Sequence, residues 1–144
     1  MCMMSHMGTG MQISLDTNVW IFGLLENDMY CIRILDNLAQ FHIVVSNQVR
    51  IELTNNLSKP ILDEFYQLMQ EAGVEINYEK VPEIYITMFE SMGLKKGDAI
   101  IGGFASFQKV DKIVSDNRDF LRGLSAGHYF EVMSPQEFCE EFGL

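Results

Sequence analysis

Acidic side chains follow the predicted strands of this chain, at positions where several carboxylates could act together. Asp16 ends the segment ISLD, and Asp116 follows the segment KIVS. Glu52 and Asp98 each lie in the first half of a predicted helix. Carboxylates crowded within a few ångströms repel and raise one another's pKa unless a cation lies between them. Such a set of oxygen ligands favours a hard cation, Mg²⁺ or Mn²⁺.

Each acid also has a simpler explanation when it is considered alone. Asp and Asn are favoured in turns, so the segment DNRDF, with Asp116 and Asp119 three residues apart, is compatible with a plain turn. Acidic residues near the start of a helix are favoured by the helix dipole. The choice therefore depends on whether the fold brings the four acids together.

The hydrophobic pattern predicts strands that alternate with helices. Strands are predicted at 11–16, 42–46, 74–78, 112–115 and 129–133, and helices at 19–26, 30–41, 47–57, 61–73, 82–93, 97–110 and 134–144. Two of the strands are apolar throughout, which is typical of strands covered on both faces. The pattern predicts an α/β sandwich with a central, mostly parallel sheet.

Several helix boundaries can be predicted from single residues. Thr17 or Asn18 is expected to cap the first helix, and Ser46 the helix after the second strand. Pro60 suits the first turn of the next helix, and Gly73 suits its end. The segment 30–41 reads as one helix with a buried stripe of Ile32, Leu35, Leu38 and Ala39.

In a parallel sheet, ligands bind outside the carboxyl ends of the strands. Asp16 and Asp116 are expected at this edge because each ends a strand, and Glu52 because its helix follows a strand. Asp98 fits less directly, since a helix precedes its own helix. Convergence of the four would favour the metal site over separate turns and caps.

Composition limits the function classes. A chain of 144 residues with 48% apolar residues suits one folded domain, and no segment suits a membrane span or a signal peptide. Three scattered cysteines favour a reducing cytoplasm over a disulfide framework or a zinc site.

Residues 1–10 are expected to be a leader, tag-derived or disordered, before a domain at 11–144. The net charge of −10 disfavours unspecific nucleic-acid binding, so such a function would need a bound cation or a local basic feature.

From Met11 to the C-terminus, the chain resembles the PIN-domain ribonucleases. The acidic motifs LDTNVW, VSNQVRIEL, GDAIIGGFA and IVSDNRDFL stand in the family's order, with 36, 46 and 18 residues separating Asp16, Glu52, Asp98 and Asp116. The ending VMSPQEFCEEF is similar to the last strand and helix of the toxin-like, VapC-like branch.

This resemblance implies a three-layer α/β/α sandwich with a five-stranded sheet, and Mg²⁺- or Mn²⁺-dependent endonucleolytic cleavage of RNA that leaves a 5′-phosphate. It implies that the catalytic metal ligands are Asp16, Glu52, Asp98 and Asp116, and that Asp119 is an outer ligand. An RNA substrate, a small antitoxin and a homodimer are the implied partners, and the apolar helices of 30–72 could offer the groove or dimer surface.

Other polar residues near the motifs are candidate substrate contacts. Thr17, Asn18 and Ser115 could orient a carboxylate or a phosphate, and could equally be caps. Four basic residues flank the later motifs and could contact phosphates: Lys95, Lys96, Arg118 and Arg122. Asn117 occupies a place where the family often has a basic residue, which leaves the ligand set intact.

Two other functions remain open at this stage. A PIN-like domain without catalysis could bind RNA or a protein. A phosphatase or receiver domain would also place Asp at strand ends, but the phosphatase pattern requires Asp where Asn18 stands, and the acidic pair of receivers is not evident.

Overall fold

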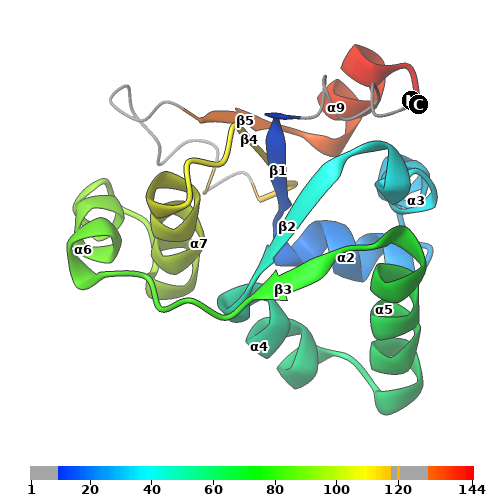
Figure 1. The fold of residues 1–144 in the computed structure, drawn as a ribbon, viewed down its shortest axis with the longest axis horizontal. Helices are drawn as coiled ribbons and strands as arrows, with labels where there is room; N and C mark the ends of the chain where they lie inside the picture. The colour runs from blue at the N-terminus through cyan, green and yellow to red at the C-terminus, as the bar shows by residue number, and fades with distance from the viewer. Residues whose placement is uncertain (1–9, 118–119, 121–129) are drawn as a thin grey trace.

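A sheet of five parallel strands forms the centre of the protein (Figure 1). The computed structural model describes residues 10–117, 120 and 130–144. The strands are β1 (Gln12–Leu15), β2 (His42–Ser46), β3 (Glu75–Asn77), β4 (Lys112–Val114) and β5 (Glu131–Met133), in the spatial order β3-β2-β1-β4-β5. Every neighbouring pair is parallel, so the predicted five-stranded parallel sheet is confirmed.

Helices cover both faces of this sheet, which confirms the three-layer sandwich. On one face are α2 (Thr17–Leu24), α3 (Met29–Asp36), α5 (Lys59–Ala72) and α9 (Pro135–Phe142); on the other are α6 (Glu83–Ser91) and α7 (Lys96–Phe107) (Figure 1). The remaining helix, α4 (Asn47–Asn56), contacts both α2 and α7, so it joins the two helical layers. None of the described helices is long and apolar enough to cross a membrane.

The residues predicted to start α4 and to start and end α5 are confirmed. The Ser46 hydroxyl accepts a hydrogen bond from the Val49 N–H at 3.2 Å and so caps α4. Pro60 lies in the first turn of α5, and Gly73 ends that helix in the left-handed region at φ 72°.

Two local predictions were wrong. The N-cap of α2 is Asp16, because the helix starts at the residue directly after the strand-ending acid and leaves no turn residue between them. The segment 30–41 is not one helix, since α3 ends before Asn37 and a 3₁₀ turn follows. The Asn37 side chain donates to the carbonyl of Arg33 at 2.7 Å, a local bond that competes with the helical pattern. The buried stripe predicted for this segment is also wrong in part, because Ala39 is exposed, and Ile34, which the prediction left out, is buried.

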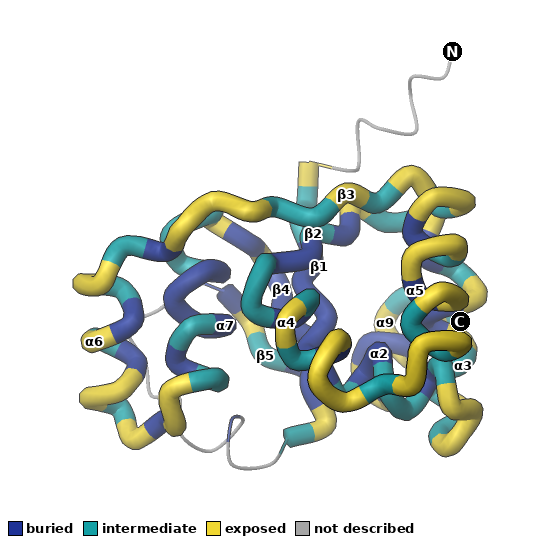
Figure 2. Tube along the Cα trace, turned by 90° about the horizontal axis from the view of Figure 1, so that it is seen from below, coloured by how far each residue is buried: buried dark blue, intermediate teal, exposed yellow. Residues whose placement is uncertain are grey.

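The two central strands are buried on both faces (Figure 2). Ile13 and Leu15 of β1, and Ile113 and Val114 of β4, are almost fully inaccessible to solvent. The two glycines of α7 allow α6 to pack closely. At Gly103, an added Cβ would lie 3.3 Å from the α6 backbone, and at Gly102 it would lie 3.1 Å from the Phe89 ring.

The chain order places the ends of β1 and β4 side by side. From β1 the chain proceeds outward through β2 to β3, and then returns to add β4 on the opposite side of β1. Such a reversal of strand order is where ligands bind in open α/β sheets, because the connections leave in opposite directions. Asp16 and Ser115 follow these two strands directly.

Candidate active site

Asp16 lies at this reversal of strand order, between the ends of β1 and β4, and the residue is only 3% exposed. The backbone N–H of Thr17 donates to Asp16 Oδ1 at 2.8 Å, and the hydroxyl of Ser115 donates to Asp16 Oδ2 at 2.6 Å. The Asp16 N–H in turn donates to the carbonyl of Val114 at 2.8 Å. Side chain and backbone thus tie the end of β1 to the end of β4.

Burial raises the pKa of Asp16 to about 6. The hydrogen bonds from Ser115 and Thr17 act in the opposite direction, while the negative charges of Asp98 and Glu52 raise the pKa further. A carboxylate whose pKa is raised by desolvation and by like charges is typical of functional sites; networks of ion pairs with a structural role also shift pKa values. Carboxylates from β1, α4 and α7 therefore interact electrostatically at one edge of the sheet.

Glu52 is held in place by two side chains. The Thr17 hydroxyl donates to Glu52 Oε1 at 2.6 Å, and the Gln48 amide donates to Oε2 at 2.7 Å. The first turn of α7 passes close by, since a Cβ at Gly97 would lie only 2.9 Å from Glu52 Oε2. The absence of a side chain at Gly97 thus lets α7 begin beside this acid.

Asp98 is connected to the end of β4 through Asn117. The Asn117 amide donates to Asp98 Oδ2 at 3.1 Å, and the Asn117 N–H donates to the Ser115 hydroxyl at 3.0 Å. The Asn117 side-chain oxygen accepts from the Phe120 N–H at 3.2 Å. Asn117, which replaces a basic residue common in the resembled family, is therefore a structural link between α7 and β4.

Asp116 lies at the same edge and is exposed. Its backbone N–H donates to the Asn18 side chain at 3.3 Å. Lys95 and Lys96 are exposed beside Asp98 at the start of α7. The remaining predicted site residues, Asp119, Arg118 and Arg122, lie outside the described residues.

The described acidic side chains lie at this edge of the sheet, but they do not form a closed set of metal ligands. Across residues 10–117, 120 and 130–144, no group of three or more His, Cys, Asp or Glu side chains is arranged to hold a metal ion. The ligand set Asp16, Glu52, Asp98 and Asp116 therefore stays a prediction.

The residues nevertheless fit a hard cation in their chemistry. All four proposed ligands are carboxylates. Burial is the main cause of the raised pKa of Asp16, and the negative charges of Asp98 and Glu52, which a cation would neutralise, add to it. A carboxylate oxygen that accepts one hydrogen bond keeps a further acceptor site, so the bonds to Asp16 and Glu52 leave room for coordination. The described cysteines do not compete, because Cys31 and Cys139 are buried and burial raises the pKa of both thiols.

Sequence reasoning missed two positioning residues of this site, Gln48 and Asn117. Gln48 is four residues before Glu52 on α4, a spacing that places two side chains on one helical face and so offered a signal. The sequence left two roles open for Thr17 and Ser115, namely to cap a helix or to orient a carboxylate or a phosphate. In the structure, both side chains donate hydrogen bonds to carboxylates.

The raised pKa of Asp16 predicts a specific pH dependence of stability. The folded pKa is about 6 and the ordinary value is 3.8. The contribution of Asp16 is therefore fully present below pH 4 and is lost as the pH rises through 6. In EDTA, the unfolding free energy of the parent should fall relative to Asp16→Asn by roughly 2 kcal/mol between pH 4 and 7. Urea unfolding across this range measures the difference, and parallel curves for the two proteins would contradict it.

Comparison with known proteins agrees with the fold. The sequence model of the PIN domain matches residues 13–123. A crystal structure of VapBC2 from Rickettsia felis bound to a DNA fragment from their promoter contains a chain of similar fold, with a TM-score of 0.63 and 20% identity over 86% of this chain and 98% of that chain. A comparison with curated proteins gave no match. PIN domains are generally nucleases, and these generally use divalent metal ions. Because the family model spans most of its length, the chain belongs to the PIN-domain family.

Proposed function

We propose that this protein is an endoribonuclease that uses Mg²⁺ or Mn²⁺ to hydrolyse phosphodiester bonds of RNA and leaves a 5′-phosphate. The buried carboxylate of Asp16 carries the proposal. It lies at the strand-order reversal of the sheet, and Asp98 and Glu52 are close enough to raise its pKa. A purely structural carboxylate at a helix N-cap would not need two further acids beside it.

The proposed ligands are Asp16, Glu52, Asp98 and Asp116, with Asp119 as an outer ligand. A metal held by these carboxylates would lower the pKa of a bound water molecule and stabilise the charge that develops on the phosphoryl oxygens. The protein's own groups orient the carboxylates: Ser115 and the Thr17 N–H hold Asp16, and the Thr17 hydroxyl and Gln48 hold Glu52. Asn117 holds Asp98.

Local positive charge would attract RNA to an otherwise acidic protein. We assign phosphate contacts to the exposed Lys95 and Lys96 beside Asp98, and to Arg118 and Arg122. Asn18 would contribute a hydrogen bond at the same edge, whereas the predicted substrate contact of Ser115 is not proposed again, because Ser115 is buried and its hydroxyl is bound to Asp16.

Cleavage assays with a site variant test this function. A mixture of structured RNAs should be cleaved in Mg²⁺ or Mn²⁺ and remain intact in EDTA. Asp98→Asn should lower the rate by at least about 10- to 100-fold, the loss typical even for outer-shell partners of a metal site. Glu90, one of two exposed acids of α6, provides a matched control, so Glu90→Gln should cleave like the parent.

Metal-independent cleavage, or equal cleavage by Asp98→Asn, would contradict the proposed chemistry. Binding of RNA without any cleavage would instead favour a non-catalytic PIN-like binding module.

As partners of this nuclease we propose a small antitoxin protein, which would make the chain the toxin of a type II toxin–antitoxin system, and a second copy of the chain. The similar fold in VapBC2 supports the first partner. Met29 at the start of α3 is 53% exposed, and Tyr66 on α5 is also exposed, so this helical layer offers apolar side chains to a bound segment.

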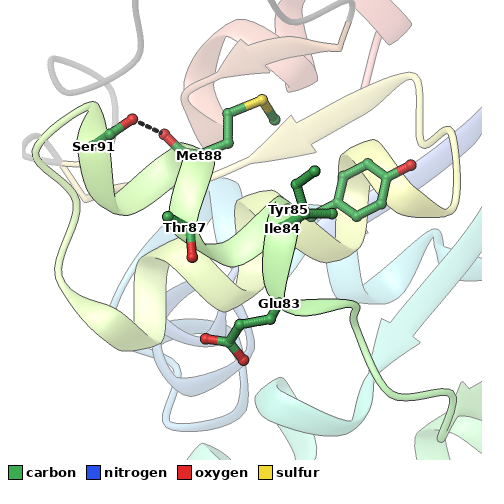
Figure 3. A pocket seen from close by; sticks show the side chains of 6 residues that line it. All are labelled: Glu83, Ile84, Tyr85, Thr87, Met88 and Ser91. Carbon is green, nitrogen blue, oxygen red and sulfur yellow. Dashed lines mark hydrogen bonds between the residues drawn. The ribbon is translucent and has the colours of Figure 1, made fainter.

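The α6 helix offers a surface for the second copy (Figure 3). Ile84 is 74% exposed, more than any other large hydrophobic side chain among the described residues. It lines an open hollow together with Tyr85 and Met88. We place the dimer contact here instead of on the helices of 30–72, because burying Ile84 would remove more apolar surface from water.

Light scattering of two charge variants separates these two partners. Ile84→Glu should halve the mass of the free protein and still bind the product of a neighbouring short reading frame. Met29→Glu should stay dimeric and lose that binding. Each variant is the control for the other, and a parent protein that is monomeric would overturn the dimer contact.

A further inference from the structure

A pocket of about 370 Å³ opens at the carboxyl edge of the sheet, next to the acidic site. Its walls include Asn47 and Gln48 at the start of α4, and Tyr78 and Lys80 after β3. These segments leave the sheet side by side because Ser46 of β2 is paired with Asn77 of β3. Figure 1 shows the chain leaving β3 and crossing beside the start of α4 toward α6. The volume lies within the range of about 300–1,000 Å³ typical of ligand sites.

Gln48 connects this pocket, hereafter the Tyr78 pocket, to the acidic site. It lines the pocket, and its amide also donates to Glu52 Oε2 at 2.7 Å. The start of α7 closes over the same place, since a Cβ at Gly97 would lie 3.8 Å from Gln48 Nε2. An occupant of the pocket would therefore be adjacent to a proposed catalytic carboxylate.

The mouth of the pocket presents an aromatic ring supported by a cation. Tyr78 is 64% exposed, and the guanidinium of Arg50 lies 5.6 Å from the centre of its ring. Arg50 is itself fixed, because its Nε donates to Asn47 Oδ1 at 2.8 Å. Aromatic rings and arginine guanidinium planes are the groups on which proteins stack unpaired nucleobases.

The rest of the lining suits a flat, partly apolar ligand attached to an anionic backbone. Val81, Ile86 and Phe104 provide a buried apolar floor. Lys80 is exposed at the rim, and the one acid among the described lining residues, Glu79, accepts a hydrogen bond from Gln108 at 2.9 Å.

We propose that the Tyr78 pocket binds a single-stranded nucleobase of the RNA substrate, next to the phosphodiester that is cleaved at the acidic edge. The base stacks on Tyr78, Gln48 and Asn47 offer amide hydrogen bonds to its edge, and Lys80 contacts a neighbouring phosphate. The inference rests on the proposed ribonuclease function and adds to it a requirement for unpaired RNA.

Binding measured without catalysis tests the pocket separately from the reaction. Fluorescence anisotropy in EDTA would compare a labelled single-stranded oligoribonucleotide with the same sequence in a duplex. Tyr78→Ala should weaken single-strand binding by about 5- to 150-fold, the loss of one base–aromatic stack, and leave duplex binding unchanged. Tyr78→Phe should restore the binding that Tyr78→Ala loses. Leu25→Ala, which removes an exposed apolar side chain outside the pocket, is the control, and thermal melting checks that each variant folds.

The outcomes separate this inference from the proposed function. Cleavage by the parent in Mg²⁺ or Mn²⁺, together with single-strand binding that Tyr78→Ala does not weaken, would overturn the pocket and leave the nuclease intact. Failure of the parent both to bind and to cleave RNA would overturn both. If Tyr78→Ala weakens binding of a protein partner and not of RNA, the pocket is a protein contact and the inference is wrong.

Discussion

The burial of the Asp16 carboxylate is the constraint on which this edge of the sheet depends. A carboxylate removed from water must be hydrogen-bonded or paired, because an unsatisfied buried charge is costly. Here one oxygen is bound by the N–H at the start of α2, and the other by the Ser115 hydroxyl at the end of β4. The two central strands are thus fixed to each other through the acid that we assign to catalysis. Its pKa of about 6 shows that these bonds only partly offset burial and the neighbouring acids.

Around Asp16, uncharged groups donate hydrogen bonds to two further acids. Thr17 and Gln48 bind Glu52, and Asn117 binds Asp98. Hydroxyl and amide donors orient a carboxylate and leave its negative charge in place, whereas lysine or arginine would neutralise it. For Asp16 and Glu52, this choice of partners suits a site whose charge is balanced by a cation from solution. The position of Glu52 also accounts for Gly97 in the first turn of α7, since a Cβ there would lie 2.9 Å from Glu52 Oε2 and displace it.

Much of the fold could be predicted from the sequence because local signals agreed with the tertiary structure. The β-branched run 42–46 is the second strand, and Ser46 and Gly73 mark helix ends as their chemistry requires. Asp98 was harder to place, because no strand directly precedes its helix. Its position at the edge depends instead on the packing of α7 against α6 and α4. The role of Asn117 depends on contacts between separate elements, which neither periodicity nor propensity encodes. The spacing of Gln48 and Glu52 on α4 did offer a signal, because residues four apart share a helical face. The Tyr78 pocket depends on the register of β2 and β3, which a single sequence also leaves open.

The central claim is that a divalent cation binds the Asp16 edge, and calorimetric titration with Mn²⁺ at pH 6, where Asp16 is about half protonated, tests it most directly. We predict that the parent protein binds Mn²⁺ with release of protons, because binding removes the residual protonation of Asp16. Asp16→Asn should lose both the binding and the proton release. Equal Mn²⁺ binding by the two proteins would contradict the account, since the buried carboxylate would then play no part in holding the metal.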